Sequence, residues 1–548
     1  MNPIEQKLIE EIIKAFDSLY QATVEASHIQ IQIPKDNANG DYSTNVAMRM
    51  SRQFQLKPVD LALALADYLT EHSDLVERAE VAGPGFLNFW VAQDELTNII
   101  SKVIEMDDRY GENQVGNNLS IMVEYISVNP TGLLHMGHAR GAAWGDSITR
   151  LMKKSNYQVT REYYVNDGGN QIDNLVLSLL ERYKEYHGLP FSLPEDGYHS
   201  LDLIEIVEKI NQLYGRELLD WPLDKQLEVL ENDGVRLELE RIKADLKRFN
   251  VEMDVYTSEK AIREAFDMEE LLKQLKDAGY LYEEEGALWF KSTAFGDDKD
   301  RVLKKSDGSY TYLTPDILYH KNKLDRGYEK LINIFGADHH GYIPRLKAAI
   351  QAIGYPADTL EVDIIQMVRI IEDGQEVRMS KRTGNAITLT EMIDDVGVDA
   401  VRYFMVSRAA DTHFDFDVKL AKSQSNDNPV YYAQYAHARM CSIEARKGDL
   451  KLASSYQLLT HEKEIDLMKW ILSFSDVVGD AALTRLPNKI CNYVQKLAQL
   501  FHSFYASCKV LDFDQPELSG QRLALVKATQ ITLRNALDLI GVSAPEVM

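Results

Sequence analysis

Hydrophobic residues follow two different periods along the chain, and the change of period divides the sequence into three parts. Between about 119 and 390, short β-type runs alternate with helical segments, which predicts a parallel sheet flanked by helices. The strand candidates are SIMVEYI, QVTREYYV, LINIFGA and DIIQMVRII. Residues 1–112 combine a helical start with the alternating run HIQIQI and a second strand candidate, VAGPGFLNFWV, which predicts a small α+β unit.

The helical period dominates elsewhere. A polar insertion of roughly 172–260 interrupts the alternation, and its apolar stripe predicts a helix: Val235, Leu239, Ile242, Leu246 and Phe249. From about 391 onward we expect no strands. Apolar positions there recur at spacings of four and three, which predicts a helix bundle: Ile490, Val494, Leu497, Phe501, Phe504 and Cys508. The predicted domains are therefore 1–112, 113–390 and 391–548, and the fold class is α/β with an all-α C-terminal part.

Composition narrows the classes of protein that fit this pattern. A chain of 548 residues exceeds one core, because cores stop growing near ~250–300 residues. The net charge of −25 argues against a uniform coat of nucleic acid, although a local basic face would still bind phosphates. Three cysteines, none in a C-x-x-C pair, predict neither a disulfide framework nor a cysteine zinc site. No run of ~18 apolar residues occurs, so we expect a cytoplasmic protein without membrane contact.

The stretch EYISVNPTGLLHMGHARG (124–141) stands where a predicted strand passes into a predicted helix. Such a junction exposes backbone N–H groups and the positive end of the helix dipole, which bind anionic phosphate. Gly137 has no side chain to block a base or ribose. His135 and His138 lie three residues apart and can both donate to phosphate oxygens. These features predict a nucleotide site.

The candidate motifs for other nucleotide and metal sites each lack one required residue. Gly111 to Gly116 is followed by Asn117 where a Walker loop needs lysine, and His461-Glu462 lacks the second histidine of a zinc motif. A second motif, RMSKRTGN (378–385), favours the nucleotide interpretation. Its cations could neutralise the charge that builds on leaving pyrophosphate.

The two motifs resemble the HIGH and KMSKS signatures of class I aminoacyl-tRNA synthetases. Longer stretches resemble the bacterial arginyl-tRNA synthetases and cover essentially the whole chain: GDYSTNVAM, VAGPGFLNF, YYVNDGGNQI, TYLTPDILYH, GADHHGY, NPVYYAQYAHAR and GVSAPEVM. The resemblance implies a Rossmann-type catalytic domain, an N-terminal domain that grips the tRNA elbow and a C-terminal domain that binds the anticodon. It also implies two steps: arginine and ATP form arginyl-adenylate and pyrophosphate, and the arginyl group then moves to the terminal ribose of the tRNA.

The resemblance further implies a role for individual residues. The catalytic positions are His135, His138, Lys381 and Arg378. The ATP-binding positions are Gly137, Asp338, His339, Met379 and Ser380. The arginine-binding positions are Asn129, Tyr312, Asp316, Asn166, Asp167 and Gln171. The tRNA-binding positions are Tyr432, Tyr435 and Arg439, from a stretch that also holds Gln434 and His437. Arg378 replaces the first lysine of KMSKS and Arg382 its last serine.

A carboxylate such as Asp316 suits the planar, permanently charged guanidinium of arginine, and Tyr312, four residues earlier, would share its helical face. The expected partners are arginine tRNA, L-arginine and ATP with Mg²⁺, for which no protein ligand set is visible, and the expected state is a monomer. We expect no editing domain, since buried polar recognition discriminates by roughly 10⁴–10⁵. The alternatives are a class I synthetase for glutamate, glutamine or cysteine, a small-molecule nucleotidyltransferase of the same fold, and a catalytically silent RNA-binding paralogue.

Overall fold

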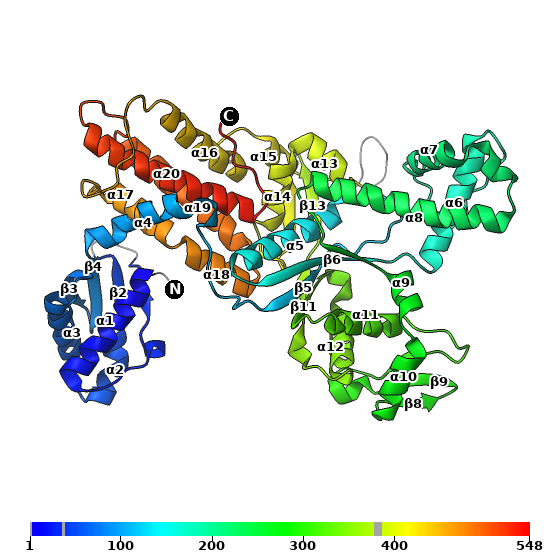
Figure 1. Cartoon of the computed structure of the whole chain (residues 1–548), viewed down its shortest axis with the longest axis horizontal. Coiled ribbons are helices and arrows are strands. Elements are labelled where there is room, and N and C mark those ends of the chain that lie inside the picture. Colours follow the sequence, from blue (N-terminus) through cyan, green and yellow to red (C-terminus); the bar gives the residue numbers. More distant parts are fainter. Residues whose placement is uncertain (1–2, 35–38, 378–385) are drawn as a thin grey trace.

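The computed structural model describes residues 3–34, 39–377 and 386–548 (Figure 1). Its centre is a sheet of five parallel strands in the order β12–β11–β5–β6–β7. The strands are β5 (Ser120–Glu124), β6 (Gln158–Val165), β7 (Val255–Ser258), β11 (Lys330–Gly336) and β12 (Leu360–Ile365). Successive strands run outward from β5 in both directions, so the carboxyl ends of β5 and its neighbours form the switch point where ligands bind in such sheets.

The sheet is covered on both faces, as the apolar run of β5 predicts. Ile121 and Val123 belong to the core that includes Trp144 of α5 (Met136–Lys154). Met122 points the other way, into the core formed with α11 (Leu313–Asp325) and α12 (Ile343–Ala352). Alternate side chains of β5 thus pack into two different cores.

DIIQMVRII is not one strand. β12 ends at Ile365, and β13 (Val368–Glu372) lies in a separate sheet with β14 (Gln375–Glu376) and β15 (Phe414–Asp417). The strand breaks because the backbone of Gln366 bonds elsewhere: its N–H donates to Ala410 at 2.9 Å and its carbonyl accepts from Arg140. β15 also shows that the expectation of no strands after 391 is wrong.

The N-terminal domain differs in two details from the prediction. VAGPGFLNFWV is not one strand: β3 (Val76–Ala82) turns back into β4 (Phe86–Val91) as an antiparallel hairpin. HIQIQI contributes only β1 (Ile31–Gln32), after a 3₁₀ helix over Ala26–His28. The sheet is completed by β2 (Tyr42–Thr44) in the order β1–β2–β4–β3 and packs with α1 (Pro3–Tyr20), α2 (Val46–Phe54) and α3 (Pro58–His72). α4 (Gln93–Met106) leads out of this domain.

The insertion is helical up to Arg248. Its helices are α6 (Asn170–Tyr186), α7 (Leu203–Tyr214) and α8 (Leu223–Arg248), which form a core of their own. The predicted apolar stripe divides: Val235 packs against that small core, whereas Ile242, Leu246 and Phe249 join the main one. β7 lies inside the expected insertion limits yet belongs to the central sheet. The prediction missed it because so short a strand left no separate sign in the sequence pattern.

Between β7 and β11 lies a smaller subdomain. It consists of α9 (Glu259–Ala265), α10 (Met268–Asp277) and the antiparallel strands β8 (Leu281–Glu284), β9 (Ala287–Phe290) and β10 (Arg301–Lys304). Figure 1 shows the N-terminal domain and the α6–α8 insertion at opposite ends of the molecule, with the central sheet and the C-terminal helices between them.

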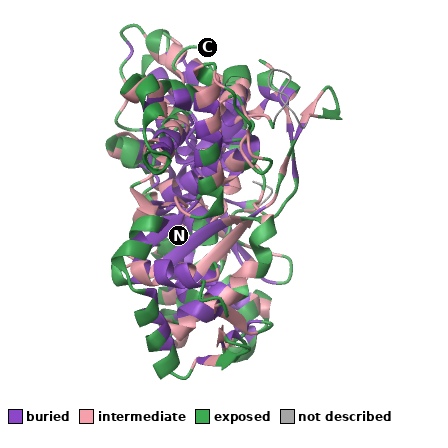
Figure 2. Ribbon diagram, turned by 90° about the vertical axis from the view of Figure 1, so that its right-hand side faces the viewer, coloured by how far each residue is buried: buried purple, intermediate pink, exposed green. Residues whose placement is uncertain are grey.

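The C-terminal part is a helix bundle with the predicted buried stripe. Helices α13 (Leu389–Val396), α14 (Val398–Val406) and α15 (Val418–Lys422) lead to α16 (Pro429–Ala445), α17 (Glu462–Leu472), α18 (Phe474–Thr484), α19 (Asn488–Ser507) and α20 (Pro516–Leu539). All six predicted stripe residues on and after α19 are buried. Figure 2 shows this continuous buried interior. No helix in the described part of the chain is long and apolar enough to cross a membrane.

Candidate active site

The two histidines of the first motif lie at the start of α5, beyond the carboxyl end of β5. His135 is the N-cap residue, and its Nδ1 accepts from the N–H of Gly137 at 3.1 Å. The Nδ1 of His138 accepts from the N–H of His135 at 3.2 Å. The imidazole rings stack with centroids 3.6 Å apart and planes 27° from parallel.

These bonds determine how the histidines meet a ligand. A ring nitrogen that accepts a hydrogen bond carries no proton, so the neutral form of each ring carries it on Nε2. Burial lowers the pKa of His135, and burial together with the neighbouring ring lowers the pKa of His138 to about 3. At neutral pH both rings are therefore uncharged, and each offers an Nε2–H donor.

The structure gives a reason for glycine at position 137 that the sequence did not indicate. A Cβ at this position would lie 2.8 Å from Cε1 of His135, closer than side chains tolerate. The missing side chain therefore lets the His135 ring fold back over the first turn of α5 and cap it. The expected approach of a base or ribose to Gly137 stays a prediction.

The loops after β5 and β6 bring most of the expected arginine-binding residues together. The amide of Asn129 donates to Gln171. In the amide orientation that suits its neighbours, Asn166 donates to Glu259 at 2.8 Å. Both oxygens of Asp167 are engaged within the protein, because they accept from Ser258 Oγ at 2.5 Å and from Lys260 N–H at 2.9 Å. Asp167 thus holds the junction of β7 and α9.

Asp316 lies in the first turn of α11 and accepts a hydrogen bond from the hydroxyl of Tyr342. Burial, together with the nearby carboxylates of Glu124 and Glu259, raises the pKa of Asp316 to about 7, against the opposing effects of Tyr342 and Lys323. A carboxyl in this state is poised to ionise when a cation reaches it.

Tyr312, expected on the same helical face as Asp316, has a different environment. It is the N-cap residue of α11 and is 85% exposed. Its ring therefore stands in solvent, whereas Asp316 is largely enclosed.

Asp338 and His339 follow β11 within a 3₁₀ helix (Ala337–Tyr342). Both side chains are exposed, and His339 Nε2 lies 3.4 Å from an oxygen of Asp338. Asp338 caps neither this helix nor α12, whose N-cap residues are Gly336 and Tyr342. The pair thus lies at the carboxyl edge of the sheet, after the strand that pairs with β5, which leads to the histidines.

The sequence analysis did not predict the buried charged residues near the carboxyl edge of the central sheet. Lys323 Nζ pairs with Glu124 at 2.5 Å, and the lysine is fully buried. Glu162 accepts from Tyr319 at 2.8 Å and pairs with Arg326 at 2.8 Å. Glu124, the charged residue that ends the apolar run of β5, was the available signal, whereas Glu162 lies in the middle of a strand with other polar residues. The second motif, with Arg378, Met379, Ser380 and Lys381, lies outside the described residues.

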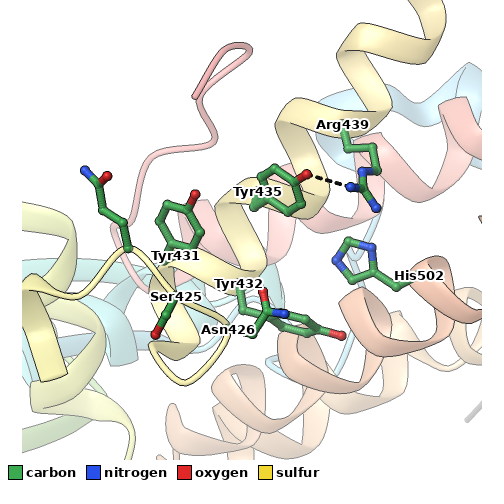
Figure 3. Close-up of a pocket in the computed structure, with 8 residues that line it drawn as sticks. Ser425, Asn426, Tyr431, Tyr432, Tyr435, Arg439 and His502 are labelled. Carbon is green, nitrogen blue, oxygen red and sulfur yellow. Dashed lines mark hydrogen bonds between the residues drawn. The ribbon is translucent and has the colours of Figure 1, made fainter.

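A hollow of about 600 Å³ lies in the C-terminal bundle (Figure 3). It is lined by Gln424, Ser425, Asn426, Tyr431, Tyr432, Tyr435, Arg439 and His502. Arg439 donates to the hydroxyl of Tyr435 at 2.5 Å and lies 4.7 Å from its ring centre. The rings of Tyr431 and Tyr435 are almost parallel, 6° apart.

The structure separates the residues of the α16 stretch into two groups. All three expected tRNA-binding residues line the hollow. Gln434 and His437 are buried instead and bond the C-terminal tail, through Ser543 at 3.0 Å and Pro545 at 2.9 Å.

Family models match nearly the whole chain. The class I (R) tRNA synthetase catalytic domain matches residues 99–412, the DALR anticodon-binding domain residues 433–548, and the arginyl-tRNA synthetase N-terminal domain residues 3–91. With the parallel sheet and the histidine pair at its edge, these matches define a class I aminoacyl-tRNA synthetase.

Individual relatives identify the amino acid that this synthetase attaches to tRNA. The chain is 50% identical to an arginine–tRNA ligase of Geobacillus kaustophilus, covering 100% of this chain and 99% of that one. It is also 50% identical to that of Bacillus subtilis, over 95% and 94% of the two chains. The chain therefore belongs to the arginine–tRNA ligase family. Thermus thermophilus arginyl-tRNA synthetase shares the fold, with a TM-score of 0.74 at 22% identity over 99% of this chain and 100% of that one.

This membership resolves the alternatives. The chain is an ATP-dependent aminoacyl-tRNA ligase that attaches arginine to tRNA. Synthetases for glutamate, glutamine or cysteine, a nucleotidyltransferase without tRNA and a silent paralogue are excluded as interpretations of this chain.

Proposed function

We propose that the ligation is divided among three groups of residues: the His135–His138 pair for ATP, the surroundings of Asp316 for arginine, and the hollow on α16 for tRNA. The observation that carries this assignment is the stacked histidine pair at the carboxyl end of β5, with both rings held by backbone N–H groups. This geometry supports a preformed set of donors for phosphate.

In the first step, a carboxylate oxygen of arginine attacks the α-phosphorus of ATP and pyrophosphate leaves. The Nε2–H groups of His135 and His138 donate to phosphate oxygens as charge moves onto the leaving group. Because both rings are neutral, positive charge has to come from other residues, and we assign this role to Arg378 and Lys381. Met379 and Ser380 would contact the nucleotide beside them.

The adenosine part of ATP is assigned to Gly137, Asp338 and His339. Mg²⁺ would arrive bound to the triphosphate. Among the described residues, no three or more His, Cys, Asp or Glu side chains are grouped so that they could hold a metal ion.

The arginine substrate would place its guanidinium against Asp316, held in position by Tyr342, with Tyr312 free to close over it. Glu259 and Asn166 lie close enough to influence the same region, as the effect of Glu259 on the pKa of Asp316 supports. Asn129 and Gln171 would hold the amino-acid end. Asp167 would act indirectly, through its bonds to Ser258 and Lys260.

In the second step, a hydroxyl of the terminal ribose attacks the arginyl carbonyl and AMP leaves. We assign the C-terminal hollow to an unpaired anticodon base, because Tyr432, Tyr435 and Arg439 offer aromatic faces and a cation there. The N-terminal domain would contact the tRNA elbow, and the insertion would connect to the acceptor end. The resemblance also supports a cytoplasmic monomer.

The test replaces His135 by asparagine. Asparagine is a good N-cap residue, so it preserves the start of α5 but lacks a donor at the place of Nε2. His461 provides a matched control, because it caps α17 in the same way: its Nδ1 accepts from the backbone N–H of Lys463 at 3.1 Å. We expect His135→Asn to lower arginine-dependent pyrophosphate exchange about 100-fold. His461→Asn should retain the wild-type rate, and equal rates for both variants would refute the assignment.

A further inference from the structure

Arg140 lies in the second turn of α5, just after the histidine pair, and is fully buried. Its guanidinium donates to three backbone carbonyls: Gln366 at 2.8 Å, Thr412 at 2.9 Å and Ala409 at 2.8 Å. Among the described residues, no carboxylate forms an ion pair with it. Asp411 attracts its charge, while all of its hydrogen bonds go to main-chain carbonyls. These bonds fix the position of the backbone that supplies the carbonyls.

The three carbonyls mark the place where the chain leaves the central sheet. Gln366 joins β12 to β13, and Ala409 and Thr412 precede β15, which pairs with β13 in parallel register. Gln366 N–H also donates to Ala410 at 2.9 Å. Arg140 thus attaches the helix of the histidines to the start of the three-stranded sheet, whose strand β14 is the last element before residues 378–385.

The chain that follows residues 378–385 returns to the same helix. Met136 N–H donates to Ile387 at 3.2 Å, and Leu389 N–H donates to Leu134 at 2.7 Å. Between these two bonds, His135 and Thr388 form an antiparallel bridge. The described residues on both sides of the second motif are therefore tied to the beginning of α5, by main-chain bonds on one side and by Arg140 on the other.

We propose that Arg140 is a positioning residue for the first step, which holds the β12–β13 connection at a fixed place relative to His135 and His138. It acts through the backbone and does not touch the substrate. The inference rests on the proposed role of the two histidines in ATP binding. A guanidinium is required because its planar fork of donors reaches three carbonyls at once, whereas lysine presents a single ammonium group.

The main test compares Arg140→Lys with Arg182→Lys. Arg182 is a matched control, since it is also buried and donates to a carbonyl, that of His199 at 2.6 Å, but lies in the insertion. Pyrophosphate exchange is measured with arginine, ATP and tRNA. A misplacement of ~1 Å lowers rates about 100-fold, so we expect Arg140→Lys to lose roughly 10- to 100-fold in kcat. Its KM for arginine and its Kd for tRNA should stay within about twofold of wild type, and Arg182→Lys should retain the wild-type kcat.

Hydrogen exchange gives a second measurement, independent of activity. In Arg140→Lys, amides of residues 366–372 should exchange faster, while those of α7 and α8 stay unchanged. Arg140→Gln, which removes the charge, should show a larger loss of kcat. A wild-type kcat for Arg140→Lys, a loss confined to KM or to tRNA affinity, or failure of both Arg140 variants to fold would overturn the proposal.

The His135→Asn variant distinguishes failure of the inference on Arg140 from failure of the proposed ATP site. If His135→Asn is inactive while Arg140→Lys keeps its kcat, the inference on Arg140 fails and the proposed ATP site stands. If His135→Asn also keeps its kcat, the ATP site is wrong and the inference fails with it.

Discussion

Arginine binding should depend on pH through Asp316. The pKa of this carboxyl is raised to about 7, chiefly by burial and also by Glu124 and Glu259. A guanidinium in contact with a carboxylate favours the ionised form and lowers its pKa by ~1–3 units. On the proposed assignment, arginine binds the ionised form of Asp316, and binding to the protonated protein has to release a proton.

The size of the effect follows from the pKa of the free protein. At pH 8 Asp316 is mostly ionised, whereas at pH 6 only about one-tenth of the molecules carry the charge. The apparent Kd for arginine should therefore rise about tenfold from pH 8 to pH 6, equivalent to ~1.4 kcal/mol. At pH 7 about half a proton should be released for each arginine bound.

Isothermal titration calorimetry at pH 6, 7 and 8, in buffers of different ionisation enthalpy, measures both quantities. The pKa of His138, lowered to about 3, places its titration outside this range, and burial lowers the pKa of His135 from its ordinary value. Asp316→Asn should bind arginine more weakly and should lose the pH dependence. A Kd that is equal at pH 6 and pH 8, or an Asp316→Asn variant with the full pH dependence, would refute the reasoning.

Three further substitutions test other parts of the structure. Gly137→Ala should lower pyrophosphate exchange about 100-fold, because the new methyl group displaces the His135 ring, with the secondary structure seen by circular dichroism unchanged. Asp146→Asn should destabilise the folded protein by about 3–5 kcal/mol in urea unfolding, because it leaves Arg402 as a buried charge without its 2.6 Å partner. Glu5→Gln should raise the melting temperature at pH 8 but hardly at pH 5, since burial raises the pKa of Glu5 to about 7 and the folded protein favours its protonated form. An equal gain at both pH values would contradict that assignment.

The sequence predicted the architecture wherever a pattern was long. The parallel strands SIMVEYI, QVTREYYV and LINIFGA and the buried stripe on α19 are confirmed, because each continues over several residues with one period. The errors occurred where tertiary hydrogen bonds decide. DIIQMVRII reads as one apolar run, but the backbone at Gln366 bonds to Ala410 and Arg140, which divides the strand.

The sequence named candidate site residues but not their interactions. His135 and His138 were expected to face a ligand, yet their stacking and the bonds at each Nδ1 depend on backbone positions that no residue pattern records. Asp167 was expected among the arginine-binding residues, but its bonds to Ser258 and Lys260 could not be predicted, because these partners come more than ninety residues later in the chain.

The most direct test of the account is charging of total bacterial tRNA with each of the twenty labelled amino acids, using wild-type protein, Asp316→Asn and Asp325→Asn. Asp325 is the matched control, an exposed carboxylate at the other end of α11 that pairs with Lys321 at 2.7 Å. We predict that arginine alone is attached, that Asp316→Asn loses at least about 100-fold in rate, and that Asp325→Asn charges like wild type. Attachment of another amino acid, or wild-type charging by Asp316→Asn, would contradict the account.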